Sequence, residues 1–298
     1  SRIGGWRGGV TSVEVDAWSP PEARTYLQRE SGRDDLSDAD CDRLATELGH
    51  LPLALSHAAA FLRRRRKLFT VADYLADLEV YMKDDDLVPK DAAYRRPVYA
   101  TFQAALRDAE AEAPGAAAIM AIAAFLEPDG IPLAIFERAP SGLPPTLARV
   151  IEKPTLLRSV LDILDDLSLI ELDTEGKFLS VHRLVQAAAR DGLGGSQAAW
   201  AGHAVELMRA AFPEPSPETR LRCVSLAPHI SSLARHAPAN NATYVLGVSA
   251  AIAADALEHV CNLADRSTLI AASIAVLSHL AKADPGNAGW QYDLGISN

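Results

Sequence analysis

The stretch Leu48-Gly49-His50-Leu51-Pro52-Leu53-Ala54-Leu55 is the most specific local pattern in the sequence and joins two predicted helices. Gly49 permits a tight helix end, because a residue without a Cβ adopts backbone angles that other residues avoid. Pro52 has a fixed φ and no amide hydrogen, so it starts a helix well and offers a rigid ring that can lie against a flat base. Taken alone, the pattern fits a structural joint between helices about as well as it fits a contact to a base.

Helix signals flank this joint on both sides. Ser19-Pro20-Pro21-Glu22 places a capping residue before proline and a carboxylate three positions after the cap, which is typical of a helix start. Further helices are predicted over residues 37–48, from Pro52 to the basic run 63–67, and over residues 71–78. Residues 19–82 are therefore expected to form a four-helix domain.

A second domain is predicted over residues 98–195, after a polar, proline-marked linker at residues 83–97. Its helices are expected near residues 98–111, 114–127 and 155–168. The pattern then changes to a β-hairpin with strands at Leu169–Leu172 and Phe178–Val181, and a last helix follows from Leu184. Three helices followed by a two-stranded hairpin predict a winged-helix domain.

Residues 196–298 are predicted to be helical to the end, with prolines marking the breaks between helices. Alanine-rich segments at residues 250–256 and 271–280 favour the close helix contacts of an α-solenoid. The expected fold class is therefore mainly α: a helical domain, a winged-helix domain with a β-hairpin, and a solenoid-like helical segment.

Composition excludes several classes of protein. Hydrophobic residues make up 49% of the chain and charged residues 23%, which is the balance of a folded globular protein. No apolar run is long enough to cross a bilayer and the first residues show no secretory pattern, so a cytoplasmic protein without a membrane partner is expected. Cys41, Cys223 and Cys261 are odd in number and far apart, which fits neither a disulfide framework nor a metal site. The net charge of −10 disfavours nucleic acid as a partner.

A second specific pattern, Phe178-Leu179-Ser180-Val181-His182-Arg183-Leu184-Val185-Gln186, places His182 between a predicted strand and a predicted helix. At such a junction an imidazole and the free backbone amides of the helix start converge, which suits a phosphate group. A single histidine is more often structural, so this pattern by itself leaves both roles open.

Together, the two patterns resemble the signature of the NB-ARC (STAND-class) signalling ATPases. The first is similar to the family's GLPL motif and the second to the bacterial form of its MHD motif, and their spacing of about 130 residues is that of the family. The resemblance implies that Pro52 packs on the adenine of a bound nucleotide, with Gly49 and Leu51 in the same cofactor-binding motif. It also implies that His182 contacts the β-phosphate of ADP and holds the protein closed.

The first residues resemble the end of the family's nucleotide-binding domain, and residues 1–18 are assigned to its tail. Ser1-Arg2 is similar to a sensor segment whose arginine reports on the γ-phosphate, so Arg2 is a further candidate site residue. The remainder of that domain, with its P-loop, is expected upstream. Gly4 and Gly9 have the spacing of a phosphate-binding loop, but Val10 stands where the lysine belongs.

No catalytic residue and no metal ligand is therefore predicted. The chain as given lacks the Walker A lysine and the Walker B carboxylate that phosphoryl transfer needs, so it is not expected to be an enzyme. The full-length protein is expected to bind ATP, and its hydrolysis is left open. The cofactor, ADP or ATP, would be shared with the upstream P-loop domain, and Mg²⁺ would be held through that domain alone.

The last third of the chain resembles the segment that leads into tetratricopeptide (TPR) arrays in bacterial members of the family. The clearest match is Ala283-Asp284-Pro285-Gly286-Asn287-Ala288-Gly289-Trp290-Gln291. The resemblance implies protein partners that bind the C-terminal helical array and a homo-oligomer on activation.

Three functions compete. The leading hypothesis is the regulatory half of a nucleotide-switched signalling ATPase, which closes over ADP and couples the nucleotide state to a TPR sensor or partner-binding array. A winged-helix DNA-binding regulator is the alternative, but its third helix would carry Arg158 against Asp162, Asp165 and Asp166, whose charges repel DNA. A purely structural helical scaffold is the third, and it leaves the presence of both motifs a coincidence.

Overall fold

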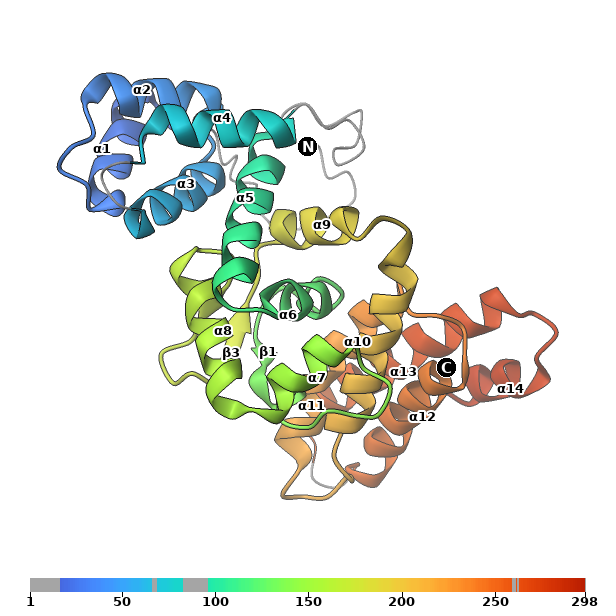
Figure 1. The fold of residues 1–298 in the computed structure, drawn as a ribbon. Coiled ribbons are helices and arrows are strands. Elements are labelled where there is room, and N and C mark those ends of the chain that lie inside the picture. Colours follow the sequence, from blue (N-terminus) through green and yellow to red (C-terminus); the bar gives the residue numbers. More distant parts are fainter. Residues whose placement is uncertain (1–16, 66–68, 83–95, 259–260, 262, 298) are drawn as a thin grey trace. The chain divides into compact units, whose positions relative to one another are not determined.

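The computed structural model describes residues 17–65, 69–82, 96–258, 261 and 263–297, and its fold is mainly α (Figure 1). The chain divides into two compact units, one that ends at Leu75 and one that begins at Ala76. Within the described residues, no helix combines the length and the apolar character that a membrane span requires.

In its described residues, the first unit contains three helices and the beginning of a fourth. They are α1 (Pro20–Ser31), α2 (Asp38–Glu47), α3 (Pro52–Arg64) and α4 (Val71–Met82), whose second half belongs to the other unit. The predicted cap of α1 is present, since the Glu22 carboxylate accepts a 2.9 Å hydrogen bond from the Ser19 amide. Ser37 caps α2 in addition, and its Oγ accepts a 3.1 Å hydrogen bond from the Asp40 amide. Helix α1 packs on α2 and α3 through a core that includes Leu27.

The second unit begins with a mixed segment in which helices surround a small sheet. Its elements are α5 (Arg96–Glu112), α6 (Ala116–Ala123), β1 (Ile131–Pro132), η2 (Leu133–Phe136), α7 (Pro145–Glu152), α8 (Pro154–Asp166), β2 (Glu171–Leu172), β3 (Phe178–Ser180) and α9 (Arg183–Gly192). The three strands are antiparallel in the order β1-β3-β2, with Ile131 opposite Leu179 and Glu171 opposite Ser180.

The predicted hairpin is confirmed, and local turn chemistry explains it. One carboxylate oxygen of Asp173 accepts hydrogen bonds from the amides of Lys177 and Phe178, at 2.6 and 2.7 Å. Gly176 adopts a φ of 62°, which favours glycine. These contacts also lower the pKa of Asp173, above all the bond from the Phe178 amide, because each stabilises the charged carboxylate.

Three details of this segment differ from the prediction. The helix expected at 114–127 already ends at Ala123, because Pro128 offers no amide hydrogen and disfavours helical angles in the residue before it. Strand β1 and helix α7 were not predicted. Lys153 alone separates α7 from α8, so the two helices meet at the extended residue before Pro154.

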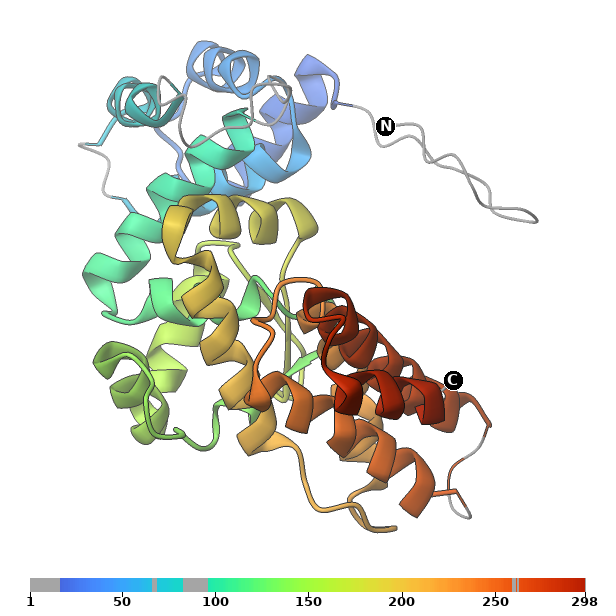
Figure 2. The same ribbon diagram turned by 90° about the vertical axis from the view of Figure 1, so that its right-hand side faces the viewer.

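Five helices follow in the described remainder of the second unit. They are α10 (Gln197–Ala211, after the short η3 at Gly194–Ser196), α11 (Arg220–Leu233), α12 (Asn241–Ala256), α13 (Leu263–Ala283) and α14 (Ala288–Ser297). Helix α13 packs on α11, α12 and α14, and Figure 2 shows this cluster in orange and red. Helices α12 and α13 approach closely at Gly247, where an added Cβ would lie 2.8 Å from a Val276 methyl group. The expected break at Pro228 is wrong, because this proline lies inside α11.

Candidate functional site

The joint between α2 and α3 places Gly49, Leu51 and Pro52 in a sharply turned segment. Gly49 and His50 both adopt left-handed angles, with φ of 61° and 56°. The amide of His50 donates to the Ala45 carbonyl at 2.8 Å and that of Gly49 to the Thr46 carbonyl at 3.0 Å, which satisfies the last carbonyls of α2. The requirement for glycine at position 49 is therefore conformational.

The side chains of the joint differ in how they could meet a ligand. Leu51 is only 4% exposed and belongs to the core of the first unit. Any ligand contact at Leu51 would have to use its backbone. Pro52 is half-buried at the first position of α3, so part of its ring faces the surface.

An aromatic groove adjoins this joint, and sequence reasoning missed it. The Trp18 amide donates to the His50 carbonyl at 2.9 Å, which ties Trp18 to the joint. The Trp18 and Tyr26 rings pack edge to face with centroids 4.7 Å apart. They line a shallow groove of about 410 Å³ together with Pro21, Glu22, Thr25 and Arg29 of α1.

His182 lies at the junction of β3 and α9, as the sequence predicted, and caps the helix. Its Nδ1 accepts a 3.2 Å hydrogen bond from the amide of Leu184. An Nδ1 that accepts leaves the proton of the neutral ring on Nε2. No partner for Nε2 occurs in the part of the chain that the structure describes, and the residue is exposed. The ring therefore presents one free N–H donor.

The electrostatics around His182 favour this neutral form. Desolvation at the helix end lowers the pKa of His182, the positive charge of Arg183 lowers it further, and Asp129 opposes both effects. One detail of the prediction changes: the Leu184 amide is occupied by the imidazole itself, so it is not free for a ligand. The donor available to a ligand at this helix end is therefore the Nε2–H of His182 and not the Leu184 amide.

The backbone before His182 is held by the segment Glu127–Gly130, named here the 127–130 loop. The Val181 amide donates to the Pro128 carbonyl at 2.8 Å. The Gly130 amide donates to Ser180 Oγ at 3.2 Å. Two hydrogen bonds therefore fix the end of β3 to a loop that precedes it by about fifty residues.

Two polar side chains of α9 attach that helix to the end of α6. Gln186 is buried and donates through Nε2 to the carbonyls of Ala123 at 2.8 Å and Leu126 at 3.1 Å. Arg190 donates to the Ala124 carbonyl. Sequence reasoning did not assign a role to either residue, because their partners lie sixty or more positions away.

A buried histidine connects the 127–130 loop to the C-terminal helices. His229 of α11 accepts a 3.2 Å hydrogen bond from the Glu127 amide at Nδ1, and its Nε2 lies 3.2 Å from the Gly130 carbonyl. Burial lowers the pKa of His229 from its ordinary 6.5 to about 4, while its two backbone hydrogen bonds oppose the shift. The ring is neutral at pH 7, so Nε2–H donates to Gly130.

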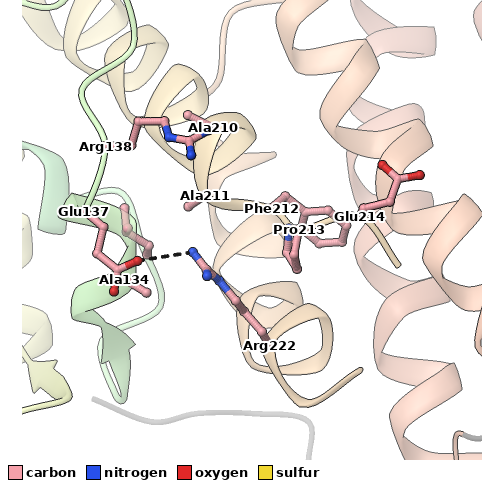
Figure 3. Close-up of a pocket in the computed structure, with 10 residues that line it drawn as sticks. Ala134, Glu137, Arg138, Ala210, Ala211, Phe212, Pro213, Glu214 and Arg222 are labelled. Atoms are coloured by element: carbon pink, nitrogen blue, oxygen red, sulfur yellow. Dashed lines mark ion pairs between the residues drawn. The ribbon is translucent and has the colours of Figure 1, made fainter. Parts of the chain in front are cut away.

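A hollow of about 400 Å³ lies elsewhere in the second unit, between η2 and the α10–α11 connection (Figure 3). Arg222 forms a 3.7 Å ion pair with Glu137, and both side chains are exposed. Figure 3 shows Arg138 beside Ala210 at the end of α10, where a cation offsets the negative end of the helix dipole. None of the predicted site residues lines this hollow, so it gives no support to a nucleotide site.

The remaining site predictions are not tested by this structure. Arg2 lies outside the described residues. Pro52 belongs to the first unit and His182 to the second. Their meeting at one nucleotide stays a prediction.

Comparisons with known proteins give two matches. The family model described as Domain of unknown function (DUF7779) matches residues 108–198, which include the sheet and His182. A protein of Hyaloscypha variabilis (strain UAMH 11265 / GT02V1 / F), named nucleotide-binding leucine-rich repeat (NLR)-like protein, is 28% identical over 243 residues. That match covers 75% of this chain and 23% of the relative, so the chain spans less than a quarter of the relative's length. No solved structure matches significantly.

Proposed function

We propose that this chain is the regulatory half of a nucleotide-switched signalling ATPase of the NB-ARC (STAND) type. Its distant relative is named as an NLR-like nucleotide-binding protein, which supports membership in a nucleotide-binding signalling group at the coarse level. The observation that carries the finer proposal is the geometry of His182. Its ring caps α9 through Nδ1 and leaves an exposed Nε2–H donor at the positive end of the helix.

That arrangement suits the β-phosphate of ADP. The start of a helix carries partial positive charge, and a neutral imidazole N–H donates to a phosphate oxygen without the cost of protonating the ring. Arg183 is exposed beside His182 and adds positive charge, whereas the exposed Asp129 reduces it. Binding of phosphate would therefore depend on further cations, which we assign to a P-loop domain that also holds Mg²⁺.

The element order supports a winged-helix domain around this histidine. Helix α6, strand β1, helices α7 and α8 and the β2–β3 hairpin follow one another, and the strand order is β1-β3-β2. A winged helix that reads DNA would use α8. The solvent-exposed residues of α8 include Arg158 but also Asp162, Asp165 and Asp166, so the regulator hypothesis is disfavoured.

In the proposed mechanism, the α2–α3 joint contributes Pro52 to the adenine and the winged-helix domain contributes His182 to the β-phosphate. Both act as lids over a nucleotide whose binding floor is the P-loop domain. The C-terminal helices α10–α14 would continue into a TPR-like array that binds protein partners, and release of ADP would open the protein for assembly into a homo-oligomer.

Calorimetric titration with ADP tests whether tight nucleotide binding requires the P-loop domain. We expect roughly millimolar or weaker affinity for residues 1–298, and micromolar or tighter affinity once a P-loop domain precedes them in one polypeptide. Micromolar binding by the present chain alone would contradict the lid account. So would the absence of binding by the longer protein.

A further inference from the structure

His229 stands out among the buried polar residues because both of its ring nitrogens bind one loop. It is 2% exposed, and its two partners, the Glu127 amide and the Gly130 carbonyl, are the ends of the 127–130 loop. An imidazole with one accepting and one donating nitrogen matches this pair of groups, and an aliphatic side chain matches neither. The ring therefore fixes the loop relative to α11.

The same loop holds the backbone that leads to His182. The Pro128 carbonyl accepts from the Val181 amide at 2.8 Å, and the Gly130 amide donates to Ser180 Oγ. Val181 immediately precedes His182 in the sequence. A continuous set of hydrogen bonds thus runs from α11 through the 127–130 loop to the N-cap of α9.

Helix α11 has contacts on both sides of this connection. It packs on β1 within the mixed segment and on α13 within the C-terminal helices. A shift of α11 that follows a change in the C-terminal helices would therefore act directly on the loop. The contacts of Gln186 and Arg190 hold the rest of α9 to the end of α6, so such a shift would act on the N-terminus of α9 while its body stays attached.

We infer that His229 is a positioning residue for His182, which transmits the position of the C-terminal helices to the N-cap of α9. The consequence for nucleotide retention rests on the proposed function, but the positional link does not. A merely structural histidine would stabilise the whole unit and would have no selective effect at the end of β3. This difference makes the inference testable without nucleotide.

Amide hydrogen exchange of this chain measures the link. In His229→Leu we expect the exchange protection of the Val181 and Leu184 amides to fall by about tenfold or more beyond any loss in α5. Without the two imidazole hydrogen bonds, local opening of the 127–130 loop costs less free energy, so these amides exchange faster. His279→Leu is the matched control: its Nε2 lies 2.8 Å from the Ala237 carbonyl, and it makes no described contact with the loop. In the control, the exchange protection of the Val181 and Leu184 amides should change by no more than that of the α5 amides.

Two milder variants keep the test decisive where His229→Leu does not fold. The oxygen of His229→Asn stands near Nδ1 and can accept from Glu127, and the nitrogen of His229→Gln stands near Nε2 and can donate to Gly130. Each keeps one of the two bonds, so each should show a smaller selective loss at Val181 and Leu184. If the loss of exchange protection at Val181 and Leu184 equals the loss in α5 in all of these variants, the inference is overturned.

A second measurement connects the link to the nucleotide. In the longer protein with its P-loop domain, His229→Leu should release ADP about tenfold faster than wild type, and His279→Leu should not. If His229→Leu released ADP at the wild-type rate while the Val181 amide still lost protection selectively, the claim that His229 affects nucleotide retention would be overturned. A wild-type protein that binds no ADP would instead refute the proposed function, and the exchange result would still decide the positional link.

Discussion

Gln186 donates a 2.8 Å hydrogen bond to the carbonyl of Ala123, at the point where α6 ends. The same amide group reaches the Leu126 carbonyl just after α6, so a side chain of α9 bonds two backbone acceptors of one distant segment. This contact, together with that of Arg190, holds α9 to the end of α6.

Gln186→Leu should therefore lower the free energy of unfolding by about 1–3 kcal/mol, because the Leu126 carbonyl would lose this donor and the Ala123 carbonyl would keep its weaker 3.3 Å bond from the Leu126 amide. Urea unfolding followed by circular dichroism measures the loss. Gln197→Leu serves as the control, since the described residues show no hydrogen bond to its side chain. Its backbone amide donates to the Gly194 carbonyl, and the substitution leaves that bond in place. Equal stability of the two variants would contradict the structural role of Gln186.

Gly49→Ala should destabilise the first unit by about 1–2 kcal/mol, because alanine is strained at a φ of 61° even though its Cβ would have space. The same substitution at Gly202, inside α10, should instead stabilise by about 0.5–1 kcal/mol through helix propensity. Denaturant unfolding of both variants checks the opposite signs. If Gly49→Ala left the free energy of unfolding unchanged, that result would contradict the left-handed conformation of Gly49 at the α2–α3 joint.

Stability should fall as the pH is lowered through the range between 6.5 and about 4, in part because of His229. Its folded pKa of about 4 lies below the ordinary 6.5, so the unfolded chain binds the proton first and acid favours unfolding. The full contribution, about 3 kcal/mol, is present above pH 6.5 and is lost by about pH 4.

Carboxylates titrate in part of the same range, so the comparison with His229→Gln isolates the histidine. The variant should show a shallower loss of stability between pH 6.5 and 5, measured as the urea midpoint. Parallel pH profiles for wild type and variant would show that the buried ring does not remain neutral in the folded state.

The chain should not bind DNA through α8, because the exposed side chains of Asp162, Asp165 and Asp166 would face the phosphates. A gel shift with random duplex at low salt should show free DNA only. Binding with a steep salt dependence would revive the regulator hypothesis, and reversal of charge at Asp162 would then locate the surface.

Sequence reasoning succeeded where the determinants are local. Ser19 with Glu22 starts α1, Asp173 organises the hairpin turn and Pro52 begins α3, and each acts on residues within a few positions of itself. These are the features that predicted the helical joint, the hairpin and the mainly α fold.

Sequence reasoning failed where the determinants are distant. Strand β1 has two residues and exists through its pairing with β3, so it carries no periodic signal. His229 bonds partners about one hundred positions away, and Gln186 bonds partners about sixty positions away. A polar residue on an apolar helix face was the available signal, and it does not identify the partner.

The central claim concerns the Nε2–H donor of His182, and one substitution separates it from the cap. His182→Asn keeps an oxygen near Nδ1 for the Leu184 amide, since asparagine is a good N-cap, but it removes the donor. Thermal stability should therefore change little. Loss of a charge-assisted hydrogen bond of about 1.5–3 kcal/mol should speed ADP release roughly ten- to a hundredfold.

The decisive measurement is the rate of ADP release from the longer protein, wild type against His182→Asn, with the melting temperatures of both. Release at least about tenfold faster at an unchanged melting temperature is the predicted result. Unchanged release would contradict the assignment of His182 to the phosphate, whatever its effect on stability.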